Sequence, residues 1–399
     1  MSVPGSRAGR SLTFLAAGRA IRSFSQAYLG VVVPLYLIAR GADAAIVGLF
    51  VTIWSAGALV LGLLGGFLAD HGGRRLVLFL FGTLSTLCAV AFVDNAPLWI
   101  IAIAGALGTI GRGGGPASGG AYGPYFSAEQ ALLAEHASHE HRTKTFAHFS
   151  FAGSLAGAAG YGLASLLARP YFWIAIAAGA AMTATVFFIS EAAHPRAERP
   201  RERIRLSPAT KRFILRLSLT NATNGLAVGF LGPMLVLWFH LRYGANAQEI
   251  GRIYLSVALA STVSYLFVAR IVRAIGSAVK TVVSLRLASC ALLAVMPFMP
   301  SIWIAGACYL VRMLFNSVTL PVRQSYVMGM VEPAERSRTA ALSNVPSQAF
   351  SMVGPAVAGV IVRDTWIGLM LEFASALQLL NAGLYWRFFR HAPPPEERT

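Results

Sequence analysis

The chain has 399 residues, of which 56% are hydrophobic and 12% are charged. Soluble globular domains carry about 25% charged residues, so this composition, with a mean hydropathy of +0.62, excludes an ordinary soluble protein. The formal net charge of +17 would suggest a nucleic-acid partner in a soluble protein. In this chain most basic residues fall in alternate loops between apolar segments, so we expect no nucleic-acid partner. Because strand-length alternation is absent, the sequence predicts an all-α membrane protein rather than a membrane barrel.

Twelve apolar segments approach or exceed the length of about 20 residues that a bilayer-spanning helix needs. In the first half of the chain they cover residues 12–39, 44–69, 75–94, 97–126, 143–168 and 171–190. In the second half they cover residues 211–241, 247–270, 278–297, 301–329, 337–362 and 366–390. The three cysteines, Cys88, Cys290 and Cys308, all fall inside these segments. We expect them to be small hydrophobic residues of the core.

The basic residues are distributed unevenly about these segments. Of the 33 Lys and Arg residues, 22 lie toward one side, 5 toward the other and 6 within the spans. By the positive-inside rule this asymmetry places both termini in the cytoplasm. We expect a multi-pass protein of the bacterial inner membrane, surrounded by the lipid bilayer.

A charged sequence, GFLADHGGRR, separates the second and third segments. It resembles the loop between helices 2 and 3 of the major facilitator superfamily of secondary transporters, whose pattern is G-x-x-x-D-[RK]-x-G-[RK]-[RK]. The matching positions are Gly66, Asp70, Gly73, Arg74 and Arg75, and His71 replaces the usual base. The resemblance implies twelve helices in two pseudo-symmetric six-helix bundles, as in bacterial drug and sugar efflux permeases, with alternating access to a central site.

In that family the acid of this motif helps to latch the two halves in the outward-facing state. By resemblance, Asp70 would lie near the start of helix 11, at residues 333–337. A carboxylate suits a helix N-terminus, where the helix dipole and free N–H groups attract negative charge. The plain alternative is a solvated loop acid.

The two halves repeat each other. Gly41–Gly48 matches Gly244–Gly251 at an offset of 203 residues, and Pro34 matches Pro233 at an offset of 199. Arg142 with Gly160 matches Arg336 with Gly354. The second copy of the charged motif keeps its glycine, Gly276, but has Arg273 in place of the acid. We expect an N-terminal bundle at residues 1–190, a basic cytoplasmic linker, partly disordered, at 191–210 and a C-terminal bundle at 211–399.

Polar residues within helices 1, 4, 7 and 10 are candidates for the solute cavity, because these helices line it in the family. The candidates are Arg22, Gln26, Arg112, Asn221, Asn224, Arg312 and Asn316. Alternatives stay open for several of them. Arg22 and the nearby Arg19 could follow the positive-inside rule, Arg112 could form a structural pair, and the asparagines could pack in the core. Arg323, on the same face of helix 10, could reach the membrane surface instead.

No Asp or Glu lies deep in these four helices, so a cavity with several arginines favours an anionic or polar solute. Glu129 and His148 are the nearest candidates for carrying a proton. Residues 135–141, EHASHEH, have spacing that could hold a divalent metal. A loop of mixed charge is the ordinary explanation, and we expect neither a metal nor a cofactor.

These observations predict a monomeric secondary transporter that moves a small organic solute by alternating access. Proton-coupled export is the preferred form, although the antiporter motif is incomplete because Ala158 occupies its proline position. Uptake or exchange of an organic anion is the close alternative, supported by the arginines. A non-transporting receptor or scaffold is the least expected, and an enzyme is not expected because no catalytic dyad or cofactor motif appears.

Overall fold

The computed structural model describes residues 5–110, 125–136, 142–191, 207–264, 267–330 and 336–390. Within these ranges the regular structure is helical. The first half contains α1 (Gly5–Ala39), α2 (Ala44–Gly72), α3 (Arg74–Val93), α4 (Leu98–Gly108), α5 (Tyr125–His136), α6 (Arg142–Leu166) and α7 (Trp173–Val186). The second half contains α8 (Pro208–Tyr243), α9 (Ala247–Ser264), α10 (Val268–Ile275), α11 (Ala278–Val295) with the short 3-10 helix η2 (Met296–Phe298), α12 (Ile302–Gly329), α13 (Arg336–Asp364) and α14 (Leu369–Phe389).

The α-helices of the described ranges match the twelve predicted spans when the fourth and the eighth spans are each assigned two helices, although α5 lies almost wholly beyond the predicted end of the fourth span at residue 126. The fourth was expected as one helix over residues 97–126, but α4 ends at Gly108 and Thr109 adopts a left-handed conformation with φ 53°. The glycine-rich sequence that follows, from Gly111 to Gly120, disfavours helix because each glycine costs about 1 kcal/mol relative to alanine. Residues 111–124 lie outside the described ranges. The eighth span is divided into α9 and α10, with residues 265–266 outside the described ranges.

The helices carry the apolar surface that a bilayer requires. Seven described helices are long and apolar enough to cross a membrane by length and composition. Large apolar side chains remain exposed on them, including Leu63 at 71% and Phe67 at 61% on α2. A water-facing surface would not carry such a density of exposed apolar residues, so this surface is suited to lipid.

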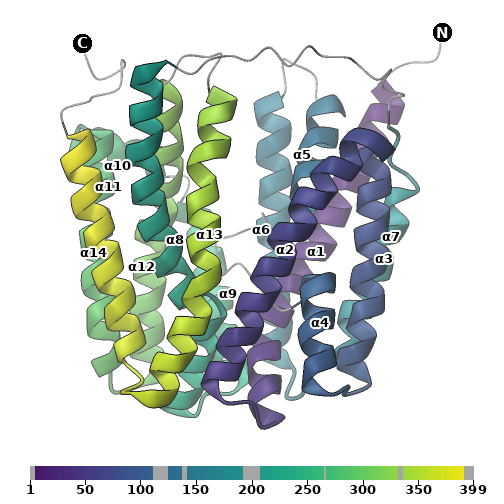
Figure 1. The fold of residues 1–399 in the computed structure, drawn as a ribbon, viewed down its shortest axis with the longest axis horizontal. Helices are drawn as coiled ribbons and strands as arrows, with labels where there is room; N and C mark the ends of the chain where they lie inside the picture. The colour runs from purple at the N-terminus through teal and green to yellow at the C-terminus, as the bar shows by residue number, and fades with distance from the viewer. Residues whose placement is uncertain are drawn as a thin grey trace. The chain divides into compact units, whose positions relative to one another are not determined.

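The chain forms two compact units. The first unit contains residues 1–194 together with 244–262, and the second contains residues 195–243 together with 263–399. In the first unit α1 packs against α6 and α7, and α3 packs against α7 and α4 (Figure 1). In the second unit α8 packs against α13 and α14, and α11 packs against α12 and α14. The boundaries between the two bundles and the linker, at residues 190 and 210, stay predictions.

The first unit includes part of α9, which belongs by sequence to the second repeat. A Cβ atom at Gly251 would lie 2.6 Å from the backbone nitrogen of Ser165, so the backbone of α9 approaches that of α6 closely. The amide of Gln248 donates a hydrogen bond to the carbonyl of Leu166 at 3.2 Å. Only glycine permits this approach at position 251.

The sequence repeat is visible in the geometry of equivalent turns. Gly41 and Gly244 both have positive φ, at 84° and 66°. Two residues further on, Asp43 accepts a hydrogen bond from the N–H of Ile46 at the start of α2, and Asn246 accepts one from the N–H of Glu249 at the start of α9. The same turn glycine and the same type of N-cap are therefore used in both repeats.

Close approaches between helices repeat as well. A Cβ atom at Gly160 of α6 would collide with the carbonyl of Phe24 on α1. One at Gly354 of α13 would lie 2.7 Å from the Cα atom of Gly229 on α8. The glycines that match in sequence thus allow the same two helices of each repeat to touch.

Candidate functional site

A buried cluster of charges lies inside the first unit. Nη1 and Nη2 of Arg22 donate to the two carboxylate oxygens of Glu129, at 2.5 and 2.7 Å. Nη1 of Arg19 approaches the same carboxylate at 3.4 Å. All three residues are buried, with exposures of 3 to 4%. Arg22 therefore forms a two-point contact with Glu129, which is the strongest geometry available to a guanidinium and a carboxylate.

The local structure explains how these charges meet. Arg19 and Arg22 are separated by three residues and lie on one face of α1, while Glu129 lies on α5. The guanidinium of Arg22 stands 5.0 Å from the ring centre of Tyr125, and that of Arg19 stands 5.4 Å from the ring centre of Phe149. Among the described residues, the cluster holds two cations for one carboxylate, so these three side chains carry a net positive charge when Glu129 is ionised.

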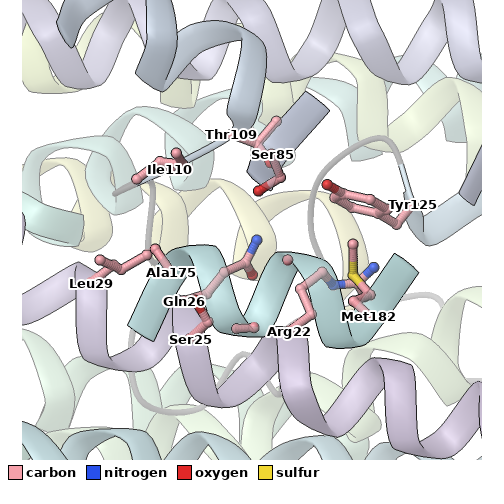
Figure 2. A pocket seen from close by; sticks show the side chains of 12 residues that line it. Arg22, Ser25, Gln26, Leu29, Ser85, Thr109, Ile110, Tyr125, Ala175 and Met182 are labelled. Carbon is pink, nitrogen blue, oxygen red and sulfur yellow. The ribbon is translucent and has the colours of Figure 1, made fainter. Parts of the chain in front are cut away.

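A small pocket opens beside this cluster (Figure 2). Arg22 and Gln26 of α1 form one wall, and the amide of Gln26 points into the space. The opposite wall includes Thr109 at the end of α4 and Ser85 of α3, and Tyr125 stands at one end. The phenol of Tyr125 donates to the carbonyl of Phe81 at 2.7 Å. The two candidates on α1, Arg22 and Gln26, thus face the same pocket, and Arg112 lies outside the described residues.

A second set of polar residues lies inside the second unit. Nη2 of Arg323 on α12 donates to the amide oxygen of Asn221 at 2.6 Å. The amide nitrogen of Asn221 donates in turn to the carbonyl of Ser343 at 2.8 Å. Nη1 of Arg286 on α11 donates to the amide oxygen of Asn224 at 2.6 Å. The two asparagines predicted on this helix therefore each hold an arginine.

The remaining candidates are on α12. Arg312 is 5% exposed, and its guanidinium lies 5.9 Å from the ring centre of Tyr309. Asn316 is half-buried one turn further along. Both residues stay predicted cavity residues.

The charged motif between α2 and α3 forms a tight turn rather than a loop. Gly73 is the single residue between the two helices, with φ 97° and ψ 151°, a combination that is essentially restricted to glycine. The carboxylate of Glu191 accepts hydrogen bonds from the backbone N–H groups of Arg74 and Arg75, at 2.7 and 3.1 Å. Glu191 thereby satisfies two free donors at the start of α3.

The paired arginines of the motif bind neighbouring elements of the same unit. Arg74 forms an ion pair with Glu135 on α5 at 2.9 Å, and Arg75 donates to the carbonyl of Phe187 at 3.3 Å. A Cβ atom at Gly66 would meet no heavy atom within 4 Å. The side chain of Asp70 and residues 331–335 lie outside what the structure describes, so the latch stays a prediction.

The histidine-rich segment is only partly covered. His136 contacts the carbonyl of Leu132 at 2.9 Å, whereas residues 137–141 lie outside the described ranges. Within those ranges, no three His, Cys, Asp or Glu residues are grouped closely enough to hold a metal ion.

Sequence reasoning missed some of these residues. Arg286 was not singled out, although a charge inside an apolar span is itself a signal of a buried polar site. Glu129 was considered only as a candidate proton carrier, because its pairing with α1 depends on tertiary structure. The role of Glu191 had no signal, since it is the first residue of the predicted linker and caps a helix more than 100 positions earlier.

Comparison with known proteins agrees with this architecture. The family model described as the Major Facilitator Superfamily matches residues 15–319 and 217–399. No curated protein matches the chain. The fold class predicted from the sequence is therefore confirmed.

Solved structures share the fold over nearly the whole chain. A D-xylose–proton symporter has a TM-score of 0.72 at 14% identity, covering 97% of this chain and 98% of its own. The nucleoside transporter NupG has a TM-score of 0.64 at 14% identity, covering 95% and 98%. The human organic anion transporter MFSD10 has a TM-score of 0.66 at 18% identity, covering 95% and 99%. At these identities the likeness concerns the fold alone.

Proposed function

The chain belongs to the major facilitator superfamily and is a multi-pass membrane protein and secondary transporter of a small solute; from this premise we propose that it couples the transport of a small organic anion to the transport of a proton. In this proposal Glu129 carries the proton and Arg22 binds the anionic group of the solute. The observation that carries the proposal is the two-point contact between Arg22 and Glu129 beside a pocket that Arg22 itself lines.

Coupling between proton binding and anion binding follows from the charge balance of Arg19, Arg22 and Glu129. While Glu129 is ionised, its carboxylate occupies the guanidinium of Arg22. Protonation removes the negative charge that Glu129 presents to the buried guanidiniums of Arg22 and Arg19, and this loss is costly in a medium of low dielectric constant. A carboxylate or phosphate group of the solute, entering the pocket, supplies that counter-charge. Proton and anion therefore favour each other's binding.

Gln26 and Tyr125 position the solute in this scheme. The amide of Gln26 points into the pocket and offers both a donor and an acceptor. Tyr125 closes one end of the pocket and contacts the guanidinium of Arg22 through its ring. Polar groups of this kind orient a ligand in a mainly apolar site.

Because proton and anion bind together, they move in the same direction. In a bacterial inner membrane with both termini in the cytoplasm and an inward proton gradient, that direction is uptake. The arrangement therefore supports the uptake of an organic anion over the proton-coupled export that the sequence favoured. We propose that a single chain carries out the cycle.

The latch belongs to the same proposal. Asp70→Asn should reduce transport while membrane insertion stays normal, because the motif around Gly73 acts in switching between conformations. Wild-type transport rates in the variant would contradict this role.

The test uses the full-length protein in liposomes. Uptake of succinate, benzoate and inorganic phosphate is measured with and without an imposed pH gradient, with choline and glucose as cationic and neutral probes. We expect an anion to be accumulated only when the proton gradient is directed inward. Glu129→Gln keeps a hydrogen-bond acceptor for Arg22 but cannot exchange a proton, so we expect its anion transport to become independent of the pH gradient.

Asp94→Asn is the matched control, since Asp94 is an exposed acid at the end of α3. It should retain coupling. Coupled transport by Glu129→Gln, once gel filtration shows that the variant is folded, would refute the role of Glu129. A protein that moves none of the probes would favour the receptor or scaffold alternative.

A further inference from the structure

The second unit contains buried positive charge that no carboxylate of its described residues neutralises. We propose that Arg286, Arg323 and the hydroxyl of Tyr385 form a further binding site, which takes the carboxylate or phosphate group of a small soluble anion. All three residues belong to the second unit, and the existence of this site does not depend on the proton step proposed for Glu129.

Each of the two arginines is held by a neutral amide. Arg286 on α11 is 4% exposed and donates to Asn224 at 2.6 Å. Arg323 on α12 donates to Asn221 at 2.6 Å. The two asparagines lie three residues apart on α8, and Asn221 is itself fixed by the carbonyl of Ser343. The amides orient the guanidiniums without cancelling their charge.

The guanidiniums of Arg286 and Arg323 lie near each other, because the asparagines that hold them are neighbours on one face of α8. Arg286 interacts electrostatically with Arg323 and Arg312, and all three carry the same charge. Holding like charges together inside a protein is unfavourable unless an anion accompanies them. The structure thus maintains a local excess of positive charge among α8, α11 and α12.

A hydroxyl in the same cluster lacks a hydrogen-bond partner. Tyr385 of α14 is 2% exposed, and its hydroxyl oxygen makes no hydrogen bond within the described part of the chain. It interacts electrostatically with both Arg323 and Arg286. A buried hydroxyl without a partner costs about 1–3 kcal/mol, so an acceptor from a ligand would be stabilising here.

The acids of this unit do not neutralise the cluster. Among its described residues, only Asp364 and Glu372 are acidic. Asp364 is half-exposed and pairs with its neighbour Arg363 at 2.6 Å. Glu372 lies in the first turn of α14, more than three turns from Tyr385. The cluster therefore offers donors from three elements and needs acceptors, which a carboxylate or phosphate group supplies in the geometry that arginine prefers.

The experiment measures anion binding to the purified full-length protein by calorimetry, with succinate, benzoate and inorganic phosphate as probes. Arg22→Gln serves as background, so that binding beside Glu129 is removed. We expect one of the anions to bind in this background. Affinity should fall by about tenfold or more with Arg286→Gln or Arg323→Gln, and by roughly fivefold with Tyr385→Phe. Arg270→Gln, which replaces an exposed arginine of the same unit, should bind as the background does.

Three results would overturn the site. One is loss of all anion binding in Arg22→Gln alone, which would leave only the pocket of the first unit. Another is unchanged affinity in both Arg286→Gln and Arg323→Gln. The third is competition by phosphatidylglycerol in nanodiscs, with no binding of the soluble anions, because the ligand would then be a lipid headgroup. Tyr385→Phe removes one oxygen atom, so it keeps the test informative if an arginine variant fails to fold.

Discussion

The two units hold their interior arginines in different ways. In the first unit, Arg19 and Arg22 surround the carboxylate of Glu129, which accepts two hydrogen bonds from Arg22. In the second, Arg286 and Arg323 are held by asparagine amides. A guanidinium paired with a titratable acid can be switched by a proton, whereas one held by an amide has a partner that does not titrate. On our proposals, this difference separates a cluster that responds to protons from one that binds an anion without a proton step.

The largest effect that would test this contrast is on stability. Glu129→Ala should destabilise the protein by about 3–5 kcal/mol, because it leaves two buried arginines without their acid. Thermal unfolding in detergent measures the change. A loss below about 1 kcal/mol would mean that water or another group already compensates these charges, and the contrast would weaken.

The two arginines of the first unit should differ from each other. Arg22→Gln removes both short contacts to Glu129 and one wall of the pocket, so we expect anion transport to fall by about ten- to a hundredfold. Arg19→Gln removes a single contact of 3.4 Å and should cost only a few-fold. Initial rates in liposomes compare the two variants, and equal losses would contradict the assignment of Arg22 to the solute.

Equivalent glycines in the two repeats should also differ. Gly73 adopts φ 97° and ψ 151°, and a Cβ atom there would lie 3.0 Å from Oε2 of Glu191. Gly276 adopts a left-handed conformation with φ 78°, which other residues tolerate better, and its Cβ position is open. We expect Gly73→Ala to cost about 1–3 kcal/mol and Gly276→Ala about 1 kcal/mol in thermal unfolding. The reverse order would show that the charged turn is not the more constrained of the two.

The smallest effect is expected in the second unit. Arg286→Gln keeps an amide near Asn224 and removes a charge that Arg323 and Arg312 repel. Without a ligand, the variant should therefore be within about 0.5 kcal/mol of the wild type, or slightly more stable. A loss of several kcal/mol in the unliganded protein would mean that Arg286 is a structural residue.

Local sequence signals predicted much of the fold. Apolar segments of spanning length gave the helices, and the matched turns at Gly41 and Gly244 gave the repeat, because a left-handed turn followed by an N-cap depends on a few adjacent residues. The end of α4 at Thr109 was not predicted, although the run of glycines after Ile110 is itself a signal against helix. Boundaries of this kind depend on a balance between propensity and burial.

The candidate site was predicted less completely. Arg22 and Gln26 were chosen as candidates from their shared face of α1, and Asn221 and Asn224 from their place in the seventh span; their role in solute binding stays a prediction. The partners of these residues were not found, because Glu129 lies more than 100 positions from Arg22 and Arg286 lies 62 positions from Asn224. Pairing at that distance is a property of packing, and periodicity within one helix does not contain it.

Proton linkage to anion binding tests the central proposal most directly. Calorimetric titration of the anion in buffers of different ionisation enthalpy measures the protons taken up on binding. We predict that the wild-type protein takes up a proton as the anion binds and that Glu129→Gln binds the anion without taking one up. Proton release on binding, or the same uptake in both proteins, would contradict the account.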